Sequence, residues 1–296
     1  MKNKSNLTTP SRFASHPFNT LKGNLFPILM VLFFLPVFVS AQISHEISIN
    51  GGGGLSTLNY KLSTGKHNLG GGGEFGIGYT CVFTKMIGIH IGAEIALYNS
   101  NANLNGAKCI TPNLIDSEGD RFNMHTTLNK YKETQNAIFL NIPVMAHFQI
   151  KICKTHKFYA MGGFKFGFPI GCKYKVSDAT ITNEGYYPDY YGWLKEPEFA
   201  GYGTFTNINS NGKLPLKASV ALALEAGMKW NVGKLFAVYT GVYFDYGLNN
   251  IRKNTNFVNN TNSESVKFTT NSALPSVTNK LNLMTFGIKA RFAFIK

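Results

Sequence analysis

The sequence lacks several features that would indicate common protein classes. After residue 41 it has no run of about 18 consecutive apolar residues, which excludes membrane-spanning helices there. Its four cysteines do not have the spacing of a metal site. Acidic residues are scarce, since 15 Asp and Glu accompany 29 Lys and Arg, giving a formal net charge of +14. The basic residues are scattered rather than clustered, so we expect no nucleic-acid partner.

The residues that are abundant favour β-structure. Hydrophobic residues make up 44% of the chain and aromatic residues 14%, and there are 30 glycines. With helical spans excluded, the remaining classes are a soluble β-protein and a membrane-embedded β-barrel.

The N-terminal segment predicts export. Four basic residues and no acidic residue precede or flank an apolar run over 25–39, which ends in Val39-Ser40-Ala41. Small residues at the end of such a run predict signal-peptidase cleavage between Ala41 and Gln42. We therefore divide the chain into a signal peptide, 1–41, and one β-barrel domain, 42–296.

Eight segments alternate between apolar side chains and small or polar ones. In one of the clearest, Ile87, Ile89 and Ile91 alternate with Gly88 and His90. Successive residues of a β-strand point to opposite faces, so each such segment predicts a strand with one apolar face. The eight segments cover about 45–55, 71–83, 86–98, 134–150, 157–168, 218–231, 235–247 and 284–294. The expected fold is all-β, a closed antiparallel eight-stranded up-and-down β-barrel.

The connections between these segments alternate in length. Short ones lie near 84–86, 151–156 and 231–234, and long ones near 56–69, 99–133, 169–216 and 248–279. Transmembrane barrels place short turns in the periplasm and long loops outside the cell. We therefore predict a transmembrane barrel with four long surface loops. The alternative is a soluble lipocalin-like binder, in which the apolar faces would point inward.

Charged residues recur on the faces that would line the barrel interior. Buried charges are tolerated when they are paired, so both signs together predict an ion-pair network. We favour a structural plug over proton or ion conduction, because eight strands leave an interior that side chains fill. The predicted network comprises Glu74, His90, Glu94, Lys165, Glu225, Lys229, Asp245, Lys289 and Arg291.

The second long connection contains a polar cluster: Asp116, Ser117, Glu118, Asp120 and His125. A hydrolytic triad and a calcium site are the chemical alternatives here. Nothing in the sequence orients a base against a nucleophile, and the full pattern of a calcium loop is missing. We interpret the cluster as a polar loop and predict no catalytic residue, no metal and no cofactor.

Aromatic residues gather in the third long connection. Exposed aromatics suit recognition of a protein or glycan, although they could instead pack the loops together. The candidate recognition residues are Tyr186, Tyr187, Tyr190, Tyr191 and Trp193.

Two cysteines fall in long connections on the same side of the predicted membrane. Cys109 and Cys172 are therefore a candidate disulfide in an oxidising compartment. Cys81 and Cys153 lie near the opposite rim and are expected to be free thiols, because the intervening strand separates them.

Several motifs carry a family resemblance. They are the leader end Val39-Ser40-Ala41-Gln42, the glycine-rich first hairpin, the segment Phe139-Leu140-Asn141-Ile142-Pro143-Val144 and the closing strand 286–294. With them the chain resembles the outer-membrane β-barrel families common in Bacteroidetes, including PorT-like proteins, and more distantly the OmpA and OmpX barrels. The resemblance implies a C-terminal strand that barrel-assembly machinery recognises, and a role in protein secretion or translocation as an alternative function.

The expected function is therefore structural or interactive rather than enzymatic. We predict an integral protein of the bacterial outer membrane, in contact with outer-membrane lipid and lipopolysaccharide, with an unknown protein or glycan at its surface loops. The alternatives are the secretion component, a small channel and the lipocalin-like binder.

Overall fold

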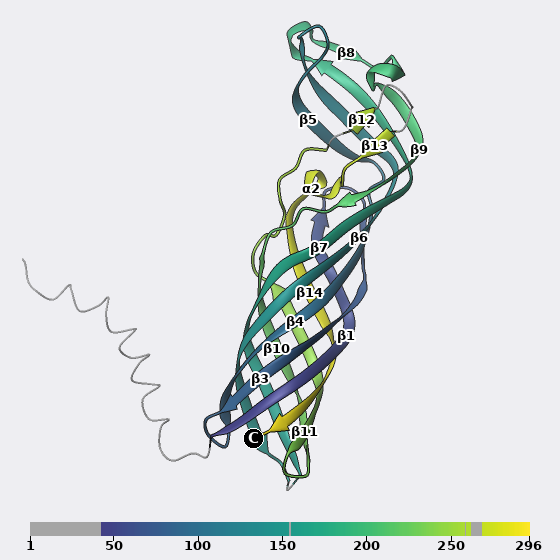
Figure 1. Cartoon of the computed structure of the whole chain (residues 1–296). Helices are drawn as coiled ribbons and strands as arrows, with labels where there is room; N and C mark the ends of the chain where they lie inside the picture. Colours follow the sequence, from purple (N-terminus) through teal and green to yellow (C-terminus); the bar gives the residue numbers. More distant parts are fainter. Residues whose placement is uncertain (1–42, 154, 258, 262–267) are drawn as a thin grey trace, which may run out of the picture. The chain divides into compact units, whose positions relative to one another are not determined.

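The computed structural model describes residues 43–296 except 154, 258 and 262–267, so the predicted signal peptide and its cleavage site lie outside the described residues. Eight long antiparallel strands form a closed ring (Figure 1). The strands are β1 (Ser44–Leu62), β3 (Gly71–Val82), β4 (Ile87–Asn103), β6 (Arg121–Lys151), β7 (His156–Tyr187), β10 (Ser219–Val232), β11 (Phe236–Gly247) and β14 (Thr278–Ile295).

The ring closes because each strand pairs with its neighbours in the chain and the ends of the series also meet. The order is β4-β3-β1-β14-β11-β10-β7-β6, and β6 pairs back onto β4. The first and last strands are adjacent, with Ile47 opposite Phe294. The prediction of a closed eight-stranded up-and-down barrel is confirmed.

Three short connections and the C-terminus lie at one end of the barrel, which we call the turn end. They join β3 to β4, β6 to β7 and β10 to β11. There the Lys296 N–H donates to the His45 carbonyl oxygen, 2.8 Å, and the His45 N–H donates back to Lys296, 3.2 Å. These bonds fix the position of the final strand beside the first.

The apolar faces of the strands point outward. On β4, Ile89, Ile91 and Ile95 are exposed, whereas His90 and Glu94 are buried. Large apolar residues on the outside of all eight strands form a belt around the ring. The belt excludes the lipocalin-like alternative, which requires the apolar faces inside. No helix in the described part of the chain is long and apolar enough to span a membrane.

Two strands are much longer than a membrane crossing requires. A transmembrane strand needs about 9–11 residues, whereas β6 has 31 and β7 has 32. Their surplus continues beyond the ring and pairs with β5 (Ala107–Ile115), β8 (Gly192–Leu194) and β9 (Gly203–Lys213) (Figure 1). We call these three strands, with the parts of β6 and β7 that pair with them, the extension sheet.

The extension sheet corrects the prediction of long loops at 99–133 and 169–216. Most of both segments is strand. They were predicted to be loops because their side chains alternate in the opposite way to those of the ring strands, with apolar residues inside and polar residues outside. Leu128 and Ile181 are buried, while Lys130 and Lys132 are exposed. This is the pattern of a sheet in water rather than in lipid.

The mouth of the barrel below the extension sheet is filled by the last long connection. There β12 (Asn259–Thr261) pairs with β13 (Phe268–Thr270), and the single turn α2 (Leu274–Val277) follows. Ile251, Phe257 and Leu274 from this connection pack in one apolar core with Leu128 and Tyr131 of β6. The same core joins the barrel mouth to the extension sheet.

Candidate functional site

The interior of the barrel holds the charged residues that the sequence analysis singled out. The ammonium group of Lys165 on β7 lies 3.0 Å from Glu74, 3.0 Å from Glu94 and 2.6 Å from Asp245. These groups come from β3, β4, β7 and β11 and are almost fully buried. One cation thus lies among three carboxylates, and further cations are needed to balance their charge.

Lys289 and Arg291 on β14 supply that balance. Lys289 pairs with Glu74, with Glu94 at 2.9 Å and with Glu225 at 3.7 Å, and Arg291 pairs with Glu225 at 2.9 Å. Pairing each buried charge with one of opposite sign offsets the free-energy cost of removing the charge from water.

Two further predicted residues lie outside this central group. His90 is buried, and its Nδ1 is 2.8 Å from the Thr80 hydroxyl. Lys229, nearer the turn end, pairs with Glu46, which also accepts a hydrogen bond from the Tyr239 hydroxyl. Glu46 was missed because the glycine run that follows it in the first strand has no side-chain pattern and makes the inward face of that strand hard to assign. Its position could have indicated that it points inward, because it lies two residues before Ser48 and four before Asn50 on the same buried face.

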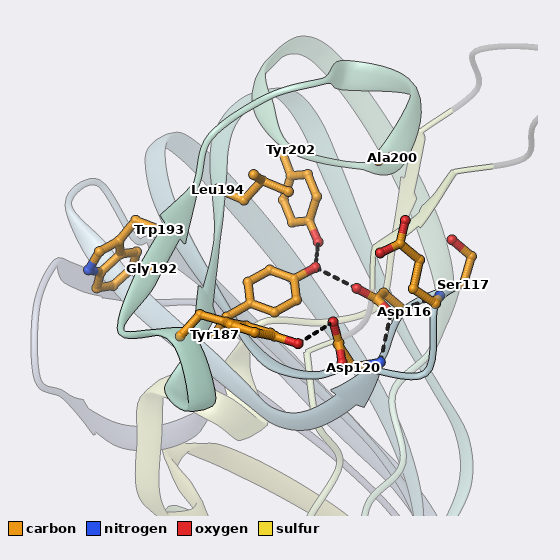
Figure 2. A pocket seen from close by; sticks show the side chains of 11 residues that line it. Asp116, Ser117, Asp120, Tyr187, Gly192, Trp193, Leu194, Ala200 and Tyr202 are labelled. Carbon is orange, nitrogen blue, oxygen red and sulfur yellow. Dashed lines mark hydrogen bonds between the residues drawn. The ribbon is translucent and has the colours of Figure 1, made fainter.

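A second site lies at the end of the extension sheet farthest from the ring. There a pocket of about 420 Å³ opens, which we call the distal pocket (Figure 2). Its volume is within the range of about 300–1,000 Å³ that is usual for small-ligand sites. The lining residues are Asp116, Ser117, Glu118, Asp120, Tyr187, Tyr190, Gly192, Trp193, Leu194, Ala200 and Tyr202.

Hydrogen bonds hold the tyrosines of the distal pocket against its carboxylates. The Tyr187 hydroxyl lies 3.0 Å from Asp116 and 2.9 Å from the Tyr202 hydroxyl (Figure 2). The Tyr190 hydroxyl donates to Asp120 at 3.1 Å. The backbone N–H groups of Asp120 and Glu118 also donate to Asp116, at 2.9 and 3.0 Å.

These contacts set the charge of the pocket. The backbone N–H of Asp120, with that of Glu118 and the Tyr187 hydroxyl, lowers the pKa of Asp116 below its ordinary value. The bond to Asp120 and the negative charge of its carboxylate raise the pKa of Tyr190. Asp116 is thus kept ionised and Tyr190 protonated, so the pocket is an anionic site with hydroxyl-bearing aromatic walls.

The distal pocket unites two groups that the sequence analysis treated separately. Asp116, Ser117, Glu118 and Asp120 follow β5, whereas the candidate aromatic residues lie on or after β7. Of the five candidate recognition residues, Tyr187, Tyr190 and Trp193 line the pocket, and Tyr186 and Tyr191 do not. Tyr186 and His125 pack on Trp193, and Tyr191 is 85% exposed.

The candidate disulfide between Cys109 and Cys172 is not formed, and both cysteines are free. Cys109 lies opposite Thr126 of β6, and Cys172 lies opposite Ala137 of the same strand. At about 3.3 Å per residue these positions are roughly 36 Å apart along β6, far beyond the 7 Å or so that a disulfide allows between Cα atoms. The prediction failed because both segments are extended strands rather than loops that can meet.

Most of the chain matches a known protein family. The family model described as "Outer membrane protein beta-barrel domain" matches residues 40–253, which is more than half of the chain. No curated protein matches the chain closely enough to indicate a relative.

Three solved structures are similar to this chain at low sequence identity. The attachment invasion locus protein Ail of Yersinia pestis, in complex with the heparin analogue sucrose octasulfate, has 12% identity and a TM-score of 0.32 over 86% of this chain and 99% of Ail. Neisserial surface protein A has 9% identity and a TM-score of 0.35 over 84% and 96%. A major outer membrane protein of Thermus thermophilus has 8% identity and a TM-score of 0.34 over 84% and 99%. At these values the similarities carry no inference about ligands.

Proposed function

Because this chain belongs to the outer-membrane protein β-barrel domain family, we propose that it is a non-enzymatic recognition protein of the cell surface. In this proposal the ring anchors the protein in the outer membrane, with its turn end in the periplasm. The extension sheet then stands outside the cell and presents the distal pocket and its exposed aromatic residues to a partner.

One observation carries the proposal: β6 and β7 run without interruption from the turn end, through the apolar belt, to the extension sheet. These two strands connect the anchor directly to the distal pocket, with register shifts in their pairing near Lys130 and Ile138. A sheet built this way holds a binding site at a fixed distance and orientation from the membrane, which is what recognition at a surface requires.

The charged interior supports a binding role over a channel role. The ion pairs around Lys165 and Lys289 link strands on different sides of the ring. Above them the apolar core with Leu274 fills the mouth. We therefore expect the full protein to produce no stepwise conductance in a planar bilayer.

The proposal is tested by removing the extension sheet from the full chain. Asn103 faces Lys132, and Lys175 faces Asn211, so a short turn can join each pair in place of 104–131 and 176–210. Full and shortened proteins are expressed in cells, and folding is verified by the mobility shift on unheated gels.

External protease should cleave the extension sheet of the full protein on intact cells. Peptide and glycan arrays probed with both purified proteins should show binding that only the full protein has. Protection from protease on intact cells, or equal array binding by the shortened protein, would contradict the proposal. Stepwise conductance by the full protein would do the same.

A further inference from the structure

Within the described part of the chain, no basic side chain pairs with the carboxylates of the distal pocket. Asp116, Glu118 and Asp120 line the pocket, yet no Lys, Arg or His among the described residues forms an ion pair with any of them. The ion pair found at this end of the extension sheet joins Lys195 to Glu184. The pocket therefore has negative charge available for a ligand.

The segments around the pocket are acidic, although the chain as a whole is basic. Segments 115–121 and 184–198 contain seven acidic residues but only Arg121 and Lys195 as basic ones, on a chain with a formal charge of +14. An anionic end of this kind attracts cations at long range and repels sulfated or phosphorylated ligands. The pocket is therefore suited to a positively charged partner.

The walls of the pocket are aromatic and fixed in position. Phe122 stacks on the ring of Tyr187 at 5.3 Å and contacts Tyr202 edge-on at 6.0 Å. The hydroxyls of Tyr187 and Tyr190 are held by the two aspartates. An organic cation gains both from aromatic faces and from neighbouring carboxylates, and a rigid site loses little entropy on binding.

A bare metal ion fits this site less well than an organic cation. No group of three His, Cys, Asp or Glu side chains converges as metal ligands anywhere in the described ranges. The carboxylates are instead spread along a pocket that also has ring faces. A guanidinium group matches such a lining, since it is planar, stacks on aromatic rings and donates several hydrogen bonds to carboxylates.

We propose that the distal pocket binds the cationic side chain of an arginine or lysine that a partner protein presents at the cell surface. The inference rests on the proposed recognition function and specifies the ligand. Asp116, Glu118 and Asp120 provide the charge, and Tyr187, Tyr190 and Tyr202 provide the aromatic walls.

The test uses the full chain folded in detergent and two fluorescent pentapeptides. One has a central arginine between glycines, and the other has citrulline, which has the same shape without the charge. The arginine peptide should bind at least about tenfold more tightly, because the charge and its hydrogen bonds are lost in citrulline. Equal affinities would overturn the proposal.

Two matched variants locate the binding. Glu118→Gln removes one charge from the pocket and should weaken arginine-peptide binding by about fivefold. Glu196→Gln removes one charge from the same end of the sheet but not from the pocket, and should change affinity less than about twofold. An equal loss in both variants would overturn the assignment to the pocket.

A second measurement avoids variants that fail to fold. On the unmodified protein, the arginine peptide should protect Asp116, Glu118 and Asp120 from carbodiimide coupling, and the citrulline peptide should not. Absence of protection would contradict the proposal. Competition by spermidine stronger than by the arginine peptide would contradict a protein side chain as the source and identify a small amine instead.

The experiments distinguish failure of the cation site from failure of the proposed surface function. Binding by the purified protein together with protease protection on intact cells would refute display at the surface and leave the cation site intact. Cleavage on intact cells with no preference for arginine over citrulline would refute the cation site alone.

Discussion

Strands β6 and β7 run through both the ring and the extension sheet, but the two regions bury different kinds of side chain. The ring buries polar and charged side chains, and the extension sheet buries apolar ones. Within the ring, β6 directs Asn141 and His147 inward and exposes Val144 and Phe148. Within the extension sheet, the same strand buries Leu128 and exposes polar residues. Side chains alternate with a period of two in both regions, apart from a register shift near Lys130, so the difference lies in what surrounds each region.

Whether the apolar side chains of an alternating strand point outward or inward depends on whether lipid or water surrounds the strand. In lipid, apolar side chains outside gain favourable contact, and paired polar groups can occupy the interior. In water, the apolar side chains must be inside. The outward side chains of β6 change from polar to apolar near Ile138, so we expect the membrane boundary there.

The largest effect is expected when the barrel interior loses a cation. Lys165→Met leaves Glu74, Glu94 and Asp245 without their shared partner. Breaking a buried ion pair in this way should cost about 3–5 kcal/mol in the free energy of unfolding. Urea unfolding in lipid vesicles measures the change. Lys165→Arg keeps the charge and serves as the control, and a loss below about 1 kcal/mol in Lys165→Met would show that the pairs are dispensable.

The next prediction compares the two outer surfaces directly. Ile288 on β14 is 72% exposed within the apolar belt, and Ile110 on β5 is 56% exposed on the extension sheet. Ile288→Arg places a charge in lipid and should cost about 2–4 kcal/mol. Ile110→Arg places it in water and should change stability by no more than about 0.5 kcal/mol. Equal costs for the two variants in vesicle unfolding would mean that both faces meet the same solvent.

A third prediction concerns the contact between the ring and the connection that fills its mouth. Buried Glu133 accepts hydrogen bonds from the Ser272 hydroxyl and the Ala273 N–H. Glu133→Ala leaves these donors unsatisfied and should cost about 1–3 kcal/mol locally. Hydrogen exchange of the Ala273 amide measures it, and unchanged protection would argue against the contact.

The same carboxyl predicts a pH dependence. Burial raises the pKa of Glu133 above its ordinary value of 4.5. A group whose folded pKa is raised contributes stability below its unfolded pKa and loses that contribution as pH rises through the folded value. Protection of Ala273, corrected for intrinsic exchange, should therefore fall as pH increases. Glu133→Gln should abolish this dependence, and a rise of protection with pH would refute the sign.

The smallest effect is expected inside the extension sheet. Ile181 on β7 is fully buried in its core. Ile181→Val removes one methylene and should cost about 0.5–1.5 kcal/mol. Hydrogen exchange should show the loss in β7 beyond the ring and no change in β10 or β11. A uniform change across the chain would mean that the two regions unfold as one unit.

The alternation of the sequence was sufficient to predict the ring and the inward side of its charges. All nine residues of the predicted network are buried, because a period of two assigns each side chain to a face wherever a strand is regular. Glu46 escaped this reasoning because the adjoining Gly51–Gly54 carry no side chains from which to read the face.

The extension sheet and the distal pocket were not predictable in the same way. β6 changes register near Lys130, so the inward positions pass from Leu128 to Tyr131 and the simple period is lost. The pocket joins Asp116 to Tyr187 across two strands of a sheet whose pairing depends on contacts distant in sequence. Local sequence patterns identified the acidic cluster and the aromatic cluster separately, but they could not predict that the two lie side by side in one pocket.

The central claim, that the ring spans the outer membrane and displays the extension sheet outside, is tested most directly by thiol labelling on intact cells. Ser117→Cys places a thiol at the distal pocket, and native Cys153 lies exposed in the β6–β7 turn, where a backbone hydrogen bond with Thr155 lowers its pKa and favours the reactive thiolate. A membrane-impermeant maleimide should label the Ser117→Cys site on intact cells, and Cys153 only after the outer membrane is permeabilised. Labelling of Cys153 on intact cells with the Ser117→Cys site protected would contradict the account.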